Sequence, residues 1–299
     1  MPNWNDLLAE LSANPTPTAL DDMRRRYILE ASKQSGRNVI AYYSSFLQKP
    51  GIEHESINDN DKQGFMNAIY GMDRSKGLDL ILHTPGGDIA ATESLVEYLK
   101  LMFGDDIRAI VPQIAMSAGT MIACACKSIV MGKHSNLGPI DPQFRGLPAS
   151  GVVEEFERAI LEVSAYPERA PVWQEIIKKY HPTFIGECEK AIEWSKSIVT
   201  KWLTENMFKD DIRSDDKVKK IVDYLSDHSE TLSHSRHIGI VDCEKVGLTI
   251  EKLEEKQEYQ DAILSMHHAY NITFSQTASI KIIENHLGRA SIINNAKLT

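Results

Sequence analysis

Two short segments of the chain place residue types that can do chemistry at the starts of predicted helices. Ser117 stands between small residues in "IAMSAGTMI", and Gly86 and Gly87 stand in "HTPGGD". Each segment follows an apolar run that predicts a buried strand. A serine hydroxyl can attack a carbonyl carbon, and backbone N–H groups can bind the oxyanion that forms. We therefore predict Ser117 as a nucleophile, with the N–H groups of Gly87 and Ala118 as oxyanion donors.

A helix cap or a packing residue is the alternative interpretation of Ser117, because serine is favoured at the start of helices. Taken alone, "AMSAGT" favours that alternative, and a lone "PGG" is an equally weak signal. Their occurrence on consecutive strand–helix turns is more specific, since the ends of parallel strands meet at one edge of a sheet. Glycine also lets backbone N–H groups approach a ligand closely. Together the two turns favour the nucleophile.

The elements that must position these turns follow one another as strand, turn and helix. This alternation predicts an α/β fold with a parallel sheet flanked by helices. The predicted strands include "RNVIAYYSSFL", "LDLILH", "IRAIVPQ" and residues 128–132, and the predicted helices include "DDMRRRYILEASKQSG", residues 57–76 and "IAATESLVEYLKLMF".

Composition and charge exclude several classes of protein. The chain has 299 residues, 42% of them hydrophobic and 25% charged, with a net charge of −9. These proportions are ordinary for a globular protein, and an acidic balance argues against a nucleic-acid surface. The apolar segment from 107 to 131 is interrupted by Arg108, Pro112 and Lys127, so we expect no transmembrane segment.

The N-terminus shows no basic segment followed by an apolar stretch, so we expect no secretory signal and a cytoplasmic location. The four cysteines form no CxxC pair, and the ten histidines show no HExxH spacing. We therefore expect reduced, packing thiols and no metal site.

Three segments resemble the serine dehydrogenase proteinase family, which belongs with signal peptide peptidase A and the Clp proteases. They are "LHTPGGDIAAT", "IAMSAGTMIACACKSIVMGKHSNLGPIDPQ" and "ASIKIIENHLGRA". The resemblance implies a Clp/crotonase-type fold, in which a parallel β-sheet spiral is flanked by helices. It also implies serine peptidase chemistry on a protein or peptide substrate, no cofactor and self-assembly. By position it assigns Ser117 as the nucleophile and Gly87 and Ala118 as the oxyanion donors, with Gly86 beside them.

We expect a helical N-terminal segment over residues 1–36 and a Clp/crotonase-like peptidase domain over residues 37–299. Residues from about 150 to 230 form a helical insertion in that domain. The C-terminal "YNITFSQTASIKIIENHLGRASIINN" carries isoleucines at helical spacing, so we expect a terminal helix there. Such an apolar helix must cover a face of its own domain or of a neighbouring subunit, and together with the self-assembly that the resemblance implies it supports a homo-oligomer.

The general base is the open question. In Clp proteases a histidine follows the nucleophile, but "SNLGPIDPQF" offers Asp141 near that place instead. The peptidase A branch resembles enzymes that use a Ser–Lys dyad. In such a dyad desolvation lowers the pKa of the lysine, so that its neutral amine can accept the serine proton. Lys190 lies among apolar neighbours on a predicted helix, so we predict it as the base, ahead of Lys178 and Lys179.

Two histidines also lie close in sequence to the turns. His83 ends the strand before "PGG", and His134 leads into "SNLGP". A structural role is the favoured interpretation of both, although either is a candidate neighbour of the site.

Two other functions remain open from the sequence. A catalytically inactive scaffold of the same fold that binds a protein partner would need no general base. A crotonase-type acyl-CoA enzyme would use a similar pair of N–H groups, but it needs no serine at position 117.

Overall fold

The structure, a computed structural model, describes residues 4–144, 146–212, 214–226 and 236–295. Its strands are β1 (Asn38–Ser44), β2 (Leu78–His83), β3 (Ile107–Val111), β4 (Ile114–Ala115), β5 (Ser128–Met131), β6 (Asn136–Leu137), β7 (Gln143–Phe144), β8 (Leu147–Pro148), β9 (Ile238–Gly239), β10 (Ile250–Lys252), β11 (Ser279–Asn285) and β12 (Ala290–Asn294).

The α-helices are α1 (Trp4–Ala13), α2 (Ala19–Ser35), α3 (Asn60–Ile69), α4 (Ile89–Phe103), α5 (Ala118–Cys124), α6 (Ala149–Ala165), α7 (Ala170–Ile177), α8 (Phe184–Trp202), α9 (Ser214–Ser226), α11 (Ile240–Val246) and α12 (Gln257–Gln276). Short helical turns of other types are η1 (Arg74–Lys76), η2 (Pro167–Arg169), η3 (Leu203–Met207) and η4 (Leu253–Glu255).

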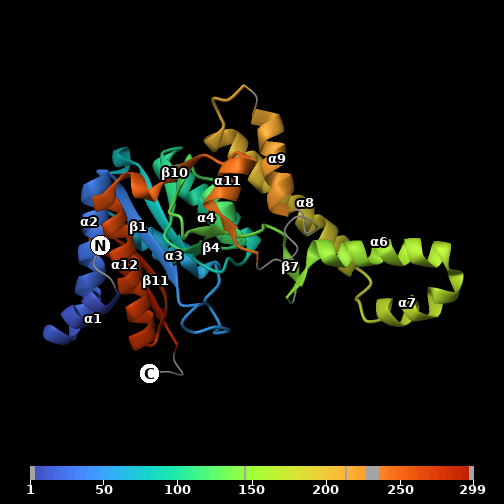
Figure 1. Cartoon of the computed structure of the whole chain (residues 1–299), viewed down its shortest axis with the longest axis horizontal. Helices are drawn as coiled ribbons and strands as arrows, with labels where there is room; N and C mark the ends of the chain where they lie inside the picture. The colour runs from blue at the N-terminus through green and yellow to red at the C-terminus, as the bar shows by residue number, and fades with distance from the viewer. Residues whose placement is uncertain (1–3, 145, 213, 227–235, 296–299) are drawn as a thin grey trace.

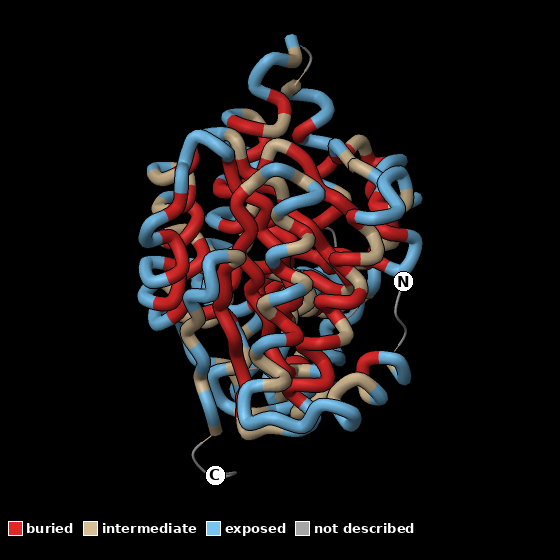
Figure 2. The backbone as a smooth tube through the Cα atoms, turned by 90° about the vertical axis from the view of Figure 1, so that its left-hand side faces the viewer, coloured by how far each residue is buried: buried red, intermediate tan, exposed pale blue. Residues whose placement is uncertain are grey.

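A seven-stranded sheet in the order β10-β5-β3-β2-β1-β11-β12 forms the centre of the molecule (Figure 1). The strands from β10 to β1 run parallel, whereas β11 and β12 pair antiparallel at one edge. The side chains of the inner strands are buried on both faces, as a sheet covered by two layers of helices requires. Buried backbone fills the centre in Figure 2, with exposed positions on the outer turns. The predicted α/β fold is therefore confirmed.

Alternate residues of each central strand point to different helical layers. On one face, Leu80 and Leu82 of β2 pack with α3, α4 and α5. On the other face, Ile81 of β2 packs with α2 and α12. Because α5 begins directly after Ser117, the first face is the one that carries the candidate site.

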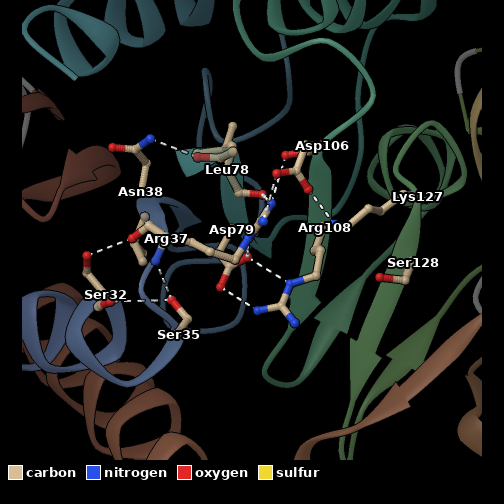
Figure 3. A network of polar contacts seen from close by, with 12 residues as sticks. Ser32, Ser35, Arg37, Asn38, Leu78, Asp79, Asp106, Arg108, Lys127 and Ser128 are labelled. Atoms are coloured by element: carbon tan, nitrogen blue, oxygen red, sulfur yellow. Dashed lines mark hydrogen bonds and ion pairs between the residues drawn. The ribbon is translucent and has the colours of Figure 1, made fainter. Parts of the chain in front are cut away.

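Charged side chains link neighbouring strands at the N-terminal ends of the parallel strands (Figure 3). Asp79 of β2 accepts hydrogen bonds from Arg37 at 2.7 Å and from both Nε and Nη2 of Arg108 on β3. Arg37 also donates to Asp106 at 2.9 Å, and Lys127 pairs with the same carboxylate. These contacts fix the strands relative to one another at the end of the sheet opposite the glycine and serine turns.

Helices α6 and α7 extend away from the body of the molecule, and α8 leads back to it (Figure 1). Around Val152 of α6 and Cys188 of α8, aromatic side chains form a small apolar cluster that is separate from the central core. The buried Ser195 of α8 donates a hydrogen bond to the carbonyl oxygen of Ile140 at 2.9 Å. We call α6, α7 and the first half of α8 the arm.

Helix α12 ends at Gln276, and the C-terminal segment after it is not helical. The prediction of a terminal helix is therefore wrong for these residues. Residues from Ser279 onward form the β11–β12 hairpin, with Ile282 and Ile283 buried on opposite faces of the sheet. Leu287 lies exposed in the turn. Ile280, Ile282 and Ile283 are therefore covered within the chain, so these isoleucines no longer support a subunit contact.

The apolar segment from 107 to 131 folds as β3, the seven-residue α5 and β5, as the sequence predicts, with the two-residue β4 between β3 and α5. Among the described residues, no helix combines the length and apolar character needed to cross a membrane.

Candidate active site

Ser117 has a backbone conformation that is rare for a residue with a side chain. It lies between β4 and α5 with φ 50° and ψ −116°, and it is partly exposed. Such a conformation costs about 1–3 kcal/mol and persists only where the surroundings impose it. Although Ser117 occupies the cap position of α5, its hydroxyl makes no capping hydrogen bond within the described structure. A helix-capping role therefore does not explain this serine.

Two glycines lie directly against this serine turn (residues 116–118). A Cβ atom on Gly86 would stand 2.7 Å from Cβ of Ser117 and 3.0 Å from the backbone nitrogen of Ala118. Gly86 and Gly87 have φ values of 99° and 156°, which residues with side chains rarely adopt. Space and conformation thus both require glycine in this glycine turn (residues 84–88).

The two turns are held together by backbone pairing that continues the sheet beyond its main strands. Thr84 forms a parallel bridge with Ala115, in which its N–H donates to Ile114 and its carbonyl accepts from Met116 at 3.0 Å. The predicted meeting of the "PGG" and "SAG" segments at one edge of the sheet is therefore found.

The N–H groups of Gly87 and Ala118 donate no hydrogen bond to any residue in the described ranges. Their neighbours are engaged, because the N–H of Gly86 donates to the Thr84 hydroxyl at 3.2 Å and that of Gly119 donates to Met116. Gly87 is exposed, so its N–H is open to water or a ligand, whereas Ala118 is fully buried and its N–H needs such a partner. The two predicted oxyanion donors are thus available beside Ser117.

The segment after β5 passes over the serine turn. The N–H of Gly138 donates to the Thr120 hydroxyl at 2.9 Å, and a Cβ atom on Gly138 would lie 3.3 Å from Cα of Met116. Asp141, further along, is buried and accepts hydrogen bonds from the hydroxyl and the N–H of Ser150 at the start of α6. Asp141 therefore joins this segment to the arm.

His83 lies on the opposite face of the sheet from Ser117. Its ring is fully buried against Tyr43 and Phe46, with centroids 5.3 Å and 4.9 Å away. Burial lowers the pKa of His83 to about 3, and neither ring nitrogen has a partner among the described residues. His134 is exposed on the same side, near His268 of α12. The structure brings neither histidine to the serine turn.

Lys190 is exposed on α8, so the partial burial expected from its sequence neighbours is not found. Lys178 and Lys179 are exposed as well. Cys188, on the same helix, is buried and belongs to the arm's apolar cluster. No hydrogen bond joins Ser117 Oγ to a described lysine, histidine or carboxylate in this chain.

One group of residues beside the glycine turn was not anticipated from the sequence. Ile57 pairs with Gly87, and the buried side chains of Asp61 and Lys281 hold the loop that carries it. A lone lysine in the apolar run "SIKIIEN" is the signal that was available. The described residues contain no group of three or more histidine, cysteine or acidic side chains arranged to hold a metal ion.

A mostly parallel sheet with a strained serine at one strand–helix turn and paired glycines at the next is typical of serine hydrolases that use backbone oxyanion donors. The family described as ClpP-like SDH-type serine proteinase matches residues 11–284, and the chain belongs to this family. The predicted resemblance and the Clp-type fold are thereby confirmed.

Two proteins of Methanocaldococcus jannaschii are similar to the chain. The uncharacterized protein MJ1495 is 28% identical over 242 residues, which cover 79% of this chain and 74% of that protein. The uncharacterized protein MJ0137 is 38% identical over 105 residues, which cover 35% of this chain and 36% of that protein. Neither name assigns an activity, so the support for a serine peptidase comes from the family as a whole.

Proposed function

We propose that the chain is a serine peptidase in which Ser117 attacks the carbonyl carbon of a peptide bond. The hydroxyl proton passes to a general base, and the carbonyl oxygen becomes an oxyanion bound by the N–H groups of Gly87 and Ala118. The base returns this proton to the peptide nitrogen, so collapse of the tetrahedral intermediate breaks the C–N bond, expels the amine and leaves an acyl-enzyme on Ser117. Water then attacks the ester and releases the acid product.

The observation that carries this proposal is the strained serine turn packed against the glycine turn: Ser117 has a φ of 50°, and a Cβ atom on Gly86 would stand 2.7 Å from its Cβ atom. The N–H groups of Ala118, at the start of α5, and of the exposed Gly87 have no partner within the described residues and are open to a ligand. Each oxyanion donor contributes about 3–4 kcal/mol to transition-state stabilisation in enzymes of this kind. That contribution depends on the distance between the two turns, which the Thr84–Ala115 bridge fixes.

We propose Lys190 as the general base. Because its side chain is exposed, it can act as a base only if something covers it during the reaction. A lysine accepts a proton near neutral pH only where its surroundings exclude water. Because Lys190 is exposed in the single chain, a bound substrate or a second copy must cover it. The proposed homo-oligomer would supply such cover.

Labelling with a fluorophosphonate probe tests the nucleophile. We expect covalent modification at Ser117, located by mass spectrometry of the peptide, and loss of both labelling and peptide hydrolysis in Ser117→Ala. Thermal stability should change little, because the hydroxyl makes no hydrogen bond within the described structure. Ser197→Ala is the matched control, since Ser197 is exposed on α8 and far in sequence from the turns.

The two competing functions predict other results. An inactive scaffold would show no labelling at Ser117, and a crotonase-type enzyme would act on an acyl-CoA thioester in Ser117→Ala as well as in the wild type. Hydrolysis that persists unchanged in Ser117→Ala would contradict the proposed mechanism.

A further inference from the structure

Lys281 and Asp61 form a buried ion pair on the face of the sheet that carries Ser117. Their side chains are 0% and 1% exposed, and Nζ of Lys281 lies 2.8 Å from Oδ1 of Asp61. Tyr42 donates its hydroxyl to Oδ2 of Asp61 at 2.8 Å, and burial raises the pKa of that tyrosine. A buried ion pair of this kind is often no more stabilising than apolar residues of similar size, so stability alone does not explain it.

Both partners of the ion pair hold the loop of residues 56–58, which we call the Ile57 loop. Lys281 donates to the carbonyl oxygen of Ser56 at 2.7 Å. Asp61 accepts from the backbone N–H of Asn58 at 3.0 Å. The peptide groups on both sides of Ile57 are therefore fixed by charged side chains, which form stronger hydrogen bonds than neutral groups do.

Ile57 in turn fixes the glycine turn. Its N–H donates to the carbonyl of Gly86 at 2.7 Å, and its own carbonyl accepts from Asp88 at 3.0 Å. These two bonds flank Gly87, so the N–H of Gly87 is directed away from the Ile57 loop and stays open. A Cβ atom on Gly87 would lie 2.3 Å from the Ile57 carbonyl oxygen, which shows how closely the two backbones approach.

We propose that Lys281 and Asp61 are positioning residues for the oxyanion hole and act through the Ile57 loop on Gly87. A glycine has few conformational constraints of its own, so its N–H direction must be imposed by what it pairs with. The inference rests on the proposed role of Gly87 as an oxyanion donor. It assigns a role in the reaction to residues that do not contact the substrate.

The same contacts exclude Lys281 as the general base. A protonated lysine has three N–H donors, and the three acceptors within reach are Ser56 O and both carboxylate oxygens of Asp61. Burial lowers the pKa of Lys281 and Asp61 opposes that shift, but every donor of the ammonium is engaged by Ser56 and Asp61 rather than by the Ser117 hydroxyl.

A double variant separates positioning from folding. A single substitution would leave one buried charge without its partner and could unfold the chain, whereas Lys281→Met with Asp61→Leu removes both charges at similar volume. The control is Arg24→Met with Glu284→Leu. Arg24 and Glu284 form an equally buried pair at 3.0 Å, and Glu284 lies on the same strand as Lys281 but packs on the α12 side of the sheet.

We expect the first-order rate of fluorophosphonate labelling at saturating probe to fall at least about 100-fold in the Lys281/Asp61 variant. The probe concentration for half-maximal rate should change little, because the binding surface is kept. The Arg24/Glu284 control should label at the wild-type rate. Unfolding in urea measures whether the two variants lose comparable stability.

Hydrogen exchange of the backbone amides tests the positioning without reference to activity. Peptides that contain residues 56–58 and 86–88 should exchange faster in the Lys281/Asp61 variant and at the wild-type rate in the control. A folded Lys281/Asp61 variant that labels within threefold of wild type, or whose exchange in both segments is unchanged, would overturn the inference. If the wild-type protein is not labelled, the proposed peptidase function fails, and the exchange result alone decides whether the ion pair holds the glycine turn.

Discussion

Gly86 is the position at which one added methyl group would reach the proposed nucleophile. We predict that Gly86→Ala lowers the labelling rate of Ser117 at least about 100-fold, because the serine turn must shift to avoid contacts of 2.7 and 2.8 Å. The positive φ adds a stability cost of about 1–2 kcal/mol. Active-site labelling and urea unfolding measure the two effects separately.

Gly36→Ala is the matched control for that substitution. Gly36 also has a positive φ, of 69°, but a Cβ atom there meets nothing within 4 Å. It should show a similar loss of stability with unchanged labelling. Equal labelling in the Gly86 and Gly36 variants would mean that the approach of Gly86 to Ser117 does not matter for the reaction.

A second prediction at this scale concerns the proposed base. Lys190→Met should lower peptide hydrolysis by orders of magnitude while leaving the unfolding midpoint unchanged, because an exposed side chain contributes little to stability. Lys201→Met, on the exposed side of the same helix, should retain activity. Hydrolysis by the Lys190 variant within about threefold of wild type would remove Lys190 from the mechanism.

At the scale of elements, the ion pairs at the N-terminal ends of the parallel strands predict how the stability of the fold depends on pH. The Arg37 guanidinium, with Lys127, lowers the pKa of Asp106 to about 2. A carboxylate whose pKa is lower in the folded state stabilises the fold above its unfolded pKa of about 3.9, and this contribution is lost as the pH falls toward 2. Asp106→Asn should therefore reduce the loss of stability between pH 4 and pH 2.

Urea unfolding at pH 6, 4 and 2.5 measures this effect. Asp105→Asn is the control, because Asp105 is exposed and pairs with Lys209 rather than with the strand network. An acid dependence of Asp106→Asn that equals that of wild type would show that the Arg37–Asp106 contact does not contribute.

The elements also show what the sequence could and could not predict. Strands β1, β2, β3 and β5 were predicted because doubly covered parallel strands appear as continuous apolar runs separated by helices, whereas the two-residue β4 was not predicted. Residues 279–294 were misread because Ile280, Ile282 and Ile283 fit a helical stripe as well as a strand. The turn at "HLGR", with Gly288 at a φ of 81°, is the hairpin signal that should have decided it.

For the site, the sequence predicted that the turns carrying Gly87, Ser117 and Ala118 meet, because adjacent strands bring them together, and the catalytic roles of these residues stay a prediction. Burial of a lysine could not be predicted in the same way. The residues next to Lys190 in sequence do not share its side of the helix, and Trp194 itself is 40% exposed. Lys281 is buried because β11 pairs with β1. This contact joins segments far apart in the sequence, so local sequence patterns do not reveal it.

For the whole molecule, the arm replaces the C-terminal segment as the reason to expect a homo-oligomer. Leu161 of α6 is 71% exposed and Val172 of α7 is 63% exposed. We predict a mass in solution well above the monomer's 33.6 kDa, and a lower mass for Leu161→Glu with Val172→Glu, because charges disfavour burial of this surface.

Light scattering coupled to size exclusion measures the mass. Leu101→Glu is the control, because Leu101, on α4 of the body, is 83% exposed and lies outside the arm. A wild-type mass of one chain at micromolar concentration would show that the arm is not a subunit contact and that Lys190 receives no cover from a second copy.

The pairing of β11 with β1 also has a consequence for the order in which parts of the proposed site form during synthesis. During synthesis the glycine and serine turns leave the ribosome well before Lys281, which must insert beside β1 to hold the Ile57 loop. Under the proposed mechanism, a growing chain would carry Ser117 before the Ile57 loop can hold the N–H of Gly87 in place. The proposed peptidase would then be inactive toward its own nascent chain until β11 pairs with β1.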